Sequence, residues 1–198
     1  SESLGHDALG LTEGWHTQER CDSWTCVTSE TGRSGEDRAA GVCIILSKRF
    51  ASRQLNRGRI GKRGFWVRIQ GPVCNLLLIC VYLSPLYSKA DIVILLKGLR
   101  EVLRARSQHD CVVLFGDFNV KFPRRYSNII GPYAYKLGKQ KLRKRTKDLL
   151  QLFAANDLCA PSTYFRPKKR QTTHTWRRAH DGSKGQIDYI VASRRWRS

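Results

Sequence analysis

Residues 111–119 read Cys-Val-Val-Leu-Phe-Gly-Asp-Phe-Asn, an apolar run that stops at a glycine and continues into a carboxylate and an amide. The run from Cys111 to Phe115 has the length and composition of a buried strand that ends in a turn. Ligands of an open α/β sheet bind beyond the carboxyl ends of its strands. Asp117 and Asn119 are therefore expected to face one cleft, where Asp117 can accept a proton from water and Asn119 can hold that water or a phosphate oxygen.

The tetrapeptide Gly116–Asn119 also fits a simpler interpretation, an Asx turn that closes a strand, because Gly, Asp and Asn all favour turns. The other strands and motifs of the chain help to decide between a catalytic turn and a purely structural one. Further apolar runs predict buried strands at Val42–Leu46, Phe65–Ile69, Leu76–Leu83 and Ile187–Ala192.

Two segments carry an apolar stripe at helical spacing. The first, Asp91–Arg106, has Asp91 as its expected N-cap, and the second, Thr146–Ala155, has Thr146 as its cap and Asn156 in its C-terminal turn. Alternating strands and helices predict an α/β fold. The length of 198 residues predicts a single domain over 1–198.

The charge of the chain narrows the class of partner. Thirty-six Lys and Arg against sixteen Asp and Glu give a net charge of +20 and a pI near 10.2. Such a basic domain usually binds a polyanion, and nucleic acid is favoured over an anionic membrane because no amphipathic basic helix has a clean apolar face. A merely basic, soluble protein is the alternative. No run approaches 18 apolar residues, so no membrane span is expected.

Residues 131–147 form the most basic segment, and Gly131, Pro132 and Gly138 predict that it is a loop leading into the second helix. Repulsion between its like charges predicts an extended conformation without a ligand. Because lysine offers few groups for reading bases, we expect this loop to follow the DNA backbone. The residues assigned to DNA contact here are Lys136, Lys139, Lys141, Arg143, Lys144, Arg145 and Lys147.

Seven cysteines occur without a C-x-x-C pair, which argues against a zinc site and indicates a reducing compartment. Two carboxylates in apolar surroundings point to a different metal. Glu13 ends the segment Asp7–Glu13, and Asp188 lies within the expected strand Ile187–Ala192. A carboxylate in a buried strand is costly unless it is paired or bound to a metal, and hard oxygen ligands suit Mg²⁺. Taken singly, Glu13 also fits a turn cap, and Asp188 an ion pair with arginine.

Six segments, in order along almost the whole chain, resemble motifs of the endonuclease/exonuclease/phosphatase superfamily. They are Leu9–Glu13 (L-x-E), Gly41–Ile44 (G-V-A-I), Val81–Pro85 (V-Y-x-P), Leu114–Asn119 (G-D-F-N), Thr173–Trp176 (F/Y-T-W) and Gln186–Ile190 (I-D-Y-I). Residues 186–198, with Asn156-Asp157-Leu158 before them, are similar to the RTE-like branch of non-LTR retrotransposons and to the domesticated proteins called craniofacial development protein 2-like.

The resemblance implies a DNase I-like sandwich, in which two mixed β-sheets pack face to face with helices outside. It implies that Glu13 binds a divalent metal, Mg²⁺ or Mn²⁺, and that Asp188 helps to arrange the metal and the water. Asp117 would orient or deprotonate the attacking water, and Asn119 would contact the phosphate. Tyr82 would donate a hydrogen bond to the scissile phosphate. The reaction would be hydrolysis of a phosphodiester that leaves a 3′-hydroxyl.

The resemblance also implies DNA as the partner, a reverse transcriptase in the same polypeptide and a nuclear location. Thr175 would touch the DNA backbone, and His174, in an expected strand near the active face, is the histidine best placed for DNA contact. Two family elements have no match here: an early strand that carries an Asn and a late Asp-His pair. Gly185 stands where many relatives place a side chain that hydrogen-bonds. We therefore expect a domain incomplete at both termini that binds DNA and nicks it poorly or not at all.

Two other functions stay open at this point. The first is a phosphomonoesterase or phospholipase of the same superfamily, which has less reason to carry the basic segment 131–147. The second is a remnant that binds nucleic acid without catalysis, because two catalytic elements have no match.

Overall fold

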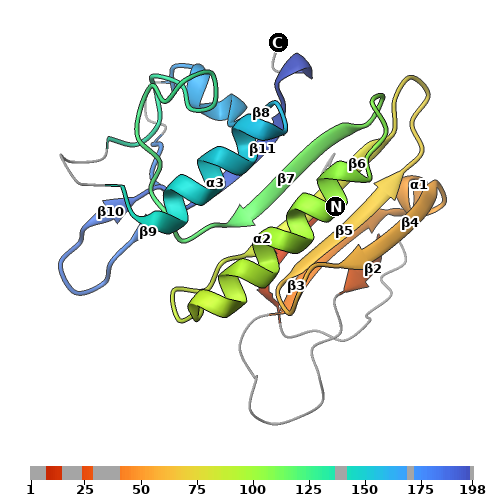
Figure 1. The fold of residues 1–198 in the computed structure, drawn as a ribbon, viewed down its shortest axis with the longest axis horizontal. Helices are drawn as coiled ribbons and strands as arrows, with labels where there is room; N and C mark the ends of the chain where they lie inside the picture. The colour runs from red at the N-terminus through yellow and green to blue at the C-terminus, as the bar shows by residue number, and fades with distance from the viewer. Residues whose placement is uncertain (1–7, 15–23, 29–40, 137–141, 169–171, 197–198) are drawn as a thin grey trace, which may run out of the picture.

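A six-stranded mixed sheet forms the centre of the computed structural model, which describes residues 8–14, 24–28, 41–136, 142–168 and 172–196. The strand order is β4-β5-β6-β7-β11-β8, and only the central pair β6–β7 is parallel (Figure 1). The strand bounds are β4 Gln54–Arg59, β5 Gly64–Ile69, β6 Leu76–Tyr82, β7 Cys111–Asp117, β8 Leu158–Cys159 and β11 Asp188–Ser193.

A three-stranded antiparallel sheet covers one face of the central sheet. Its order is β1-β3-β2, with bounds β1 Ala8–Gly14, β2 Trp24–Thr28 and β3 Gly41–Ser47. Val42, Ile44 and Leu46 of β3 share one buried cluster with the residues of β5 and β6 that face them. This face-to-face packing buries apolar side chains from both sheets, which is the expected sandwich arrangement.

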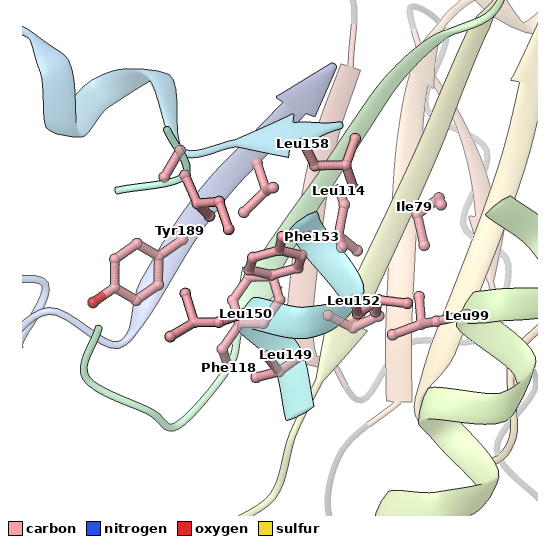
Figure 2. Packing of buried hydrophobic residues seen from close by; sticks show 14 of the residues in the cluster. Ile79, Leu99, Leu114, Phe118, Leu149, Leu150, Leu152, Phe153, Leu158 and Tyr189 are labelled. Atoms are coloured by element: carbon pink, nitrogen blue, oxygen red, sulfur yellow. The ribbon is translucent and has the colours of Figure 1, made fainter. Parts of the chain in front are cut away.

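Two helices cover the other face of the central sheet (Figure 1). The helix α2, Lys89–Arg104, connects the parallel strands β6 and β7, as a crossover between parallel strands requires. The helix α3, Lys144–Ala155, follows β7 and buries Leu149, Leu150 and Phe153. Figure 2 shows these side chains packed with residues of β6, β7 and β11 into one apolar layer.

Both helices begin earlier than the sequence predicted, so both expected N-caps were wrong. Ser88 caps α2, and Asp91 is the third helical residue, which completes a capping box with Ser88. The helix α3 starts after Arg143 without a side-chain cap, and Thr146 lies buried within its first turn. Asn156 is the C-cap residue of α3, as expected.

The basic segment 131–147 is therefore not one loop. Lys144, Arg145 and Lys147 are helical residues of α3, whereas Lys136 is an exposed loop residue. Lys139 and Lys141 lie outside the described residues. The expectation of an extended basic loop fails at its C-terminal end, because the apolar stripe of α3 packs on the core and fixes the first turn as well.

The remaining elements are short. They are α1 Lys48–Ala51, the 3-10 turns Pro161–Tyr164 and Arg194–Trp196, and the two-stranded antiparallel sheet of β9 Trp176–Arg177 and β10 Lys184–Gly185. No helix among the described residues is long and apolar enough to cross a membrane. The α/β sandwich confirms the predicted fold class.

Candidate active site

Three predicted site residues stand side by side on neighbouring strands. Asp117 pairs in register with Tyr82 across the parallel β6–β7 ladder and with Asp188 across the antiparallel β7–β11 ladder. Residues paired in register point to the same face of a sheet. That face is the one covered by the smaller sheet, because Tyr82 belongs to the buried cluster between the two sheets.

The turn after β7 is fixed by its own sequence. Gly116 has a φ of 135°, which residues with a side chain rarely adopt, and Asn119 has a φ of 46°, in the left-handed region that Asn tolerates better than most residues. Phe118, between the two polar residues, is fully buried and meets the rings of Phe153 and Tyr189 at centroid distances of 6.0 and 6.1 Å. Figure 2 shows this ring packed against side chains of α3. Because Phe118 lies between Asp117 and Asn119 in the sequence, its burial anchors the turn that carries both polar residues.

Asn119 holds the Asp117 carboxylate at both oxygens. Its backbone N–H donates to Oδ1 at 2.7 Å, and its side-chain Nδ2 donates to Oδ2 at 2.9 Å. The Asx turn that the sequence left as an alternative is thus present, and it orients the predicted catalytic carboxylate. The two interpretations of Gly116–Asn119 describe one arrangement.

Asp188 is positioned by Thr175. The Thr175 hydroxyl oxygen accepts hydrogen bonds from the backbone N–H groups of Ile187 and Asp188, both at 3.1 Å. This contact ties the segment before β9 to the first residue of β11. The prediction that Thr175 touches DNA is untested, but its hydroxyl has a definite role inside the protein.

Asp188 lines a cleft of about 1000 Å³ between the two sheets. Thr12 of β1 and Gly116 of β7 contribute to its walls, and Thr173 and Thr175 lie along the segment that precedes β9. The two sheets approach closely here, because a Cβ on Gly10 would lie 1.8 Å from the Phe115 ring. Only glycine at position 10 lets β1 lie against β7 in this way.

Glu13 lies at an irregularity in β1. The register with β3 shifts between Thr12, which pairs with Val42, and Gly14, which pairs with Gly41. Such irregularities recur beside active sites, where they redirect a side chain. The side chain of Glu13 lies outside the described part of the structure, so its predicted role as a metal ligand stays a prediction.

The described donor set suits a hard divalent cation. Two adjacent carboxylates, Asp117 and Asp188, offer oxygen ligands, and Mg²⁺ is usually held by one or two carboxylates together with substrate phosphate. Within the described residues, no group of three or more His, Cys, Asp or Glu forms a candidate metal site. The chemistry of the pair therefore fits the predicted metal, with Glu13 as the further ligand that the sequence proposes.

Tyr82 is 6% exposed and its ring lies 5.3 Å from the guanidinium of Arg63. The same guanidinium lies 5.0 Å from the ring of Tyr87. The Arg63 carbonyl also accepts a hydrogen bond from the Tyr82 backbone at 2.9 Å. Arg63 thus places a positive charge near the end of β6, which sequence reasoning missed because nothing in the local pattern links residue 63 to residue 82.

His174 is not in a strand, contrary to the expectation, because β9 begins only at Trp176. Its ring lies 6.3 Å from the ring of Tyr135. Sequence reasoning also missed Tyr189 as a structural residue of the site. Its buried hydroxyl accepts from the Phe122 backbone N–H at 3.2 Å and donates to the Gln186 carbonyl at 2.8 Å, and burial raises the pKa of Tyr189 well above its usual range.

No family model matches the chain. The chain is 29% identical over 200 residues to craniofacial development protein 2 of Bos taurus, a match that covers 100% of this chain and 33% of that protein. The chain thus spans about a third of the length of this curated relative.

Solved structures share the fold. The 3′ phosphatase NExo from Neisseria, bound to a product DNA hairpin, aligns with a TM-score of 0.60 at 18% identity, over 96% of this chain and 77% of that one. The endonuclease domain of TRAS1, a telomere-specific non-LTR retrotransposon, aligns with a TM-score of 0.54 at 13% identity, over 86% and 67%. Both are members of the endonuclease/exonuclease/phosphatase superfamily, and at these identities they establish the fold.

Proposed function

We propose that this chain, which has the fold of the endonuclease/exonuclease/phosphatase superfamily, is the hydrolytic domain of a metal-dependent DNA endonuclease that nicks target DNA for retrotransposition. The observation that carries the proposal is the in-register row Tyr82–Asp117–Asp188 at one sheet edge. Charge supports nucleic acid as the substrate, since the net charge is +20.

Phosphodiester hydrolysis assigns a task to each member of this row. Water attacks phosphorus in line, a P–O bond to that water forms, and the bond to the 3′-oxygen breaks. Asp117, held at both oxygens by Asn119, is oriented to accept the proton of the attacking water. The 3′-oxygen leaves with a proton from solvent as a 3′-hydroxyl, and the phosphate stays on the 5′ side of the other fragment.

Negative charge on the phosphate grows during this attack. A divalent cation, when bound, supplies electrostatic stabilisation of that charge. Asp188 and Glu13 are the residues that would hold it. Tyr82 and the Arg63 guanidinium near its ring lie at the same edge, where fixed donors stabilise the transition state most effectively.

We further propose that the activity depends on Mg²⁺ or Mn²⁺ and that DNA is the natural substrate. We also propose that a reverse transcriptase lies in the same polypeptide and that the protein acts in the nucleus. We also propose slow turnover by these 198 residues alone, because the family's early Asn and late Asp-His pair have no match in the sequence. A complete lack of turnover would instead favour the alternative that the protein is a remnant that binds nucleic acid without catalysis.

A substrate panel tests the proposal. The 198-residue chain and a longer protein containing it are incubated in Mg²⁺ with supercoiled plasmid, an inositol phosphate, sphingomyelin and a phosphomonoester. We expect nicked plasmid with 3′ ends that a DNA polymerase extends, and no phosphate or headgroup release from the others. Release of phosphate or headgroup without nicking would move the protein to the phosphomonoesterase or phospholipase class.

A further inference from the structure

Asn119 lines a second pocket, of about 450 Å³, which shares no lining residue with the cleft that holds Asp188. Some residues that line the cleft are nevertheless adjacent in sequence to residues that line this pocket. Thr175 and Asp188 line the cleft, whereas the adjacent Trp176 and Ile187 line this pocket.

The second pocket is basic. Its lining includes Lys121, Arg143, Arg145 and Arg178, and none of its described lining residues is acidic. Arg178 forms an exposed ion pair with Asp181 at 3.1 Å. No ion pair within the described part of the chain involves the other three cations. Three positive charges thus share one concave surface outside any ion pair of the described residues.

Arg145 is held inside this surface rather than free in solvent. Its Nη1 donates to the Ser84 carbonyl at 3.1 Å, which ties the start of α3 to the loop after β6. Partial burial, together with the positive charge of Arg143, lowers the pKa of Arg145. A bound anion would offset both effects.

The end of the Lys121 side chain lies near both Trp176 and Gly185. The Lys121 ammonium lies 5.9 Å from the Trp176 ring centroid, and the Arg178 guanidinium lies 5.6 Å from it. A Cβ on Gly185 would come within 2.6 Å of Lys121 Cε, so the glycine leaves the space through which the lysine chain runs. The absent side chain at position 185, where many relatives place one that hydrogen-bonds, makes room for a cation.

We propose that this pocket binds a backbone phosphate of the polynucleotide next to the phosphate that is cleaved. The inference rests on the proposed function and deepens it: the substrate is a chain of phosphodiesters, held at two successive places, rather than an isolated phosphate ester. Cations over an aromatic ring and a half-buried arginine provide fixed donors for one phosphate without reading a base.

The test compares two variants that lose the same charge. The pocket variant is Lys121→Gln with Arg143→Gln, and the control is Arg57→Gln with Arg100→Gln, two exposed residues that line neither concavity. Binding to a single-stranded oligonucleotide is measured without divalent metal at several salt concentrations. The pocket variant should bind about 10-fold more weakly and lose about 0.7 from the salt slope per phosphate contact, whereas the control should change little.

A second readout separates the pocket from general charge. In Mg²⁺, the KM for an oligonucleotide should rise about 10-fold in the pocket variant, while the control variant, which loses the same charge, should keep the wild-type KM. Gly185→Ala, which displaces Lys121 without removing charge, should weaken oligonucleotide binding in the same direction. Inorganic phosphate should compete only weakly with the oligonucleotide, because it fills only one of the two phosphate sites that the oligonucleotide occupies.

Equal losses in the pocket variant and the control, or no loss in either, would overturn the inference. Strong competition by inorganic phosphate, with no preference for longer oligonucleotides, would also overturn it and assign the pocket to a free phosphate. If the wild type cleaves no substrate, the proposed function fails, while a selective binding loss in the pocket variant still supports a nucleic-acid phosphate site.

Discussion

Asp188 stands directly opposite Asp117 across the antiparallel β7–β11 ladder. Cβ atoms at such positions are about 4.5–5.5 Å apart, and like charges placed there destabilise a sheet. Nothing in the core packing requires two carboxylates at this place, because Phe115 and Ile190 continue the same face with apolar side chains. The divalent cation that we propose for Asp188 would offset this repulsion.

Asp188→Asn should relieve this repulsion. Without divalent metal, the free energy of unfolding should rise by about 0.2–1 kcal/mol, the usual size of a cross-strand pair effect. Mg²⁺ should raise the melting temperature of the wild type and leave that of the variant almost unchanged. Thermal unfolding in EDTA and in Mg²⁺ measures both. A variant that is less stable than the wild type in EDTA would show that the carboxylates do not repel each other.

Thr175 should act as a positioning residue for Asp188. Thr175→Val leaves the N–H groups of Ile187 and Asp188 without their acceptor, at a cost of about 1 kcal/mol in stability. Loss of such an outer contact typically lowers metal affinity or activity about 10- to 100-fold. We expect the Mg²⁺ concentration for half-maximal cleavage to rise by such a factor in Thr175→Val and to recover in Thr175→Ser. A fall in stability with an unchanged Mg²⁺ requirement would limit Thr175 to a structural role.

Asn119 combines a backbone role with a side-chain role, and two substitutions separate them. Its φ of 46° disfavours Ala by about 1–2 kcal/mol but not Gly. Asn119→Gly should therefore stay closer to wild-type stability than Asn119→Ala, as chemical denaturation would show. Both should cleave poorly, because the Asp117 Oδ2 loses the hydrogen bond from the side-chain amide of residue 119. Normal cleavage by Asn119→Gly would show that the side-chain amide is dispensable.

Cys80 should contribute to alkaline unfolding. Burial raises the pKa of this thiol from 9.0 to about 12, so the folded protein favours the neutral form. The resulting stabilisation is complete below pH 9 and is lost as the pH rises towards 12, at up to about 1.4 kcal/mol per pH unit. Between these values, the unfolding free energy of Cys80→Ala should fall less steeply than that of the wild type. Parallel curves for the two proteins would contradict this.

The local pattern of the sequence predicted the central elements well. The runs that became β3, β5, β6, β7 and β11 are short, apolar and bounded by glycine or polar residues, which is the signal of buried strands. The helix starts were missed because both helices begin before their apolar stripes. Ser88 lies seven residues before the first fully buried leucine of α2, Leu95, so the stripe alone does not show it.

The arrangement of the candidate site was only partly accessible from sequence. Asp117 and Asn119 belong to one turn, and their proximity follows from two residues of spacing. The register that aligns Tyr82 and Asp188 with Asp117 depends on strand pairing over long separations, which no local pattern encodes. Lys121 was overlooked for a similar reason, because its place between Gly185 and Trp176 comes from tertiary packing.

The rate of plasmid nicking by Asp117→Asn, relative to a matched change elsewhere, tests the central claim most directly. The control is Asp157→Asn, at an exposed position with a φ of 53° that Asn tolerates and that lines neither the cleft nor the basic pocket. In Mg²⁺, single-turnover nicking should fall at least about 10²-fold in Asp117→Asn and stay at the wild-type rate in Asp157→Asn, with DNA binding retained by both. Equal nicking by wild type and Asp117→Asn would contradict the account.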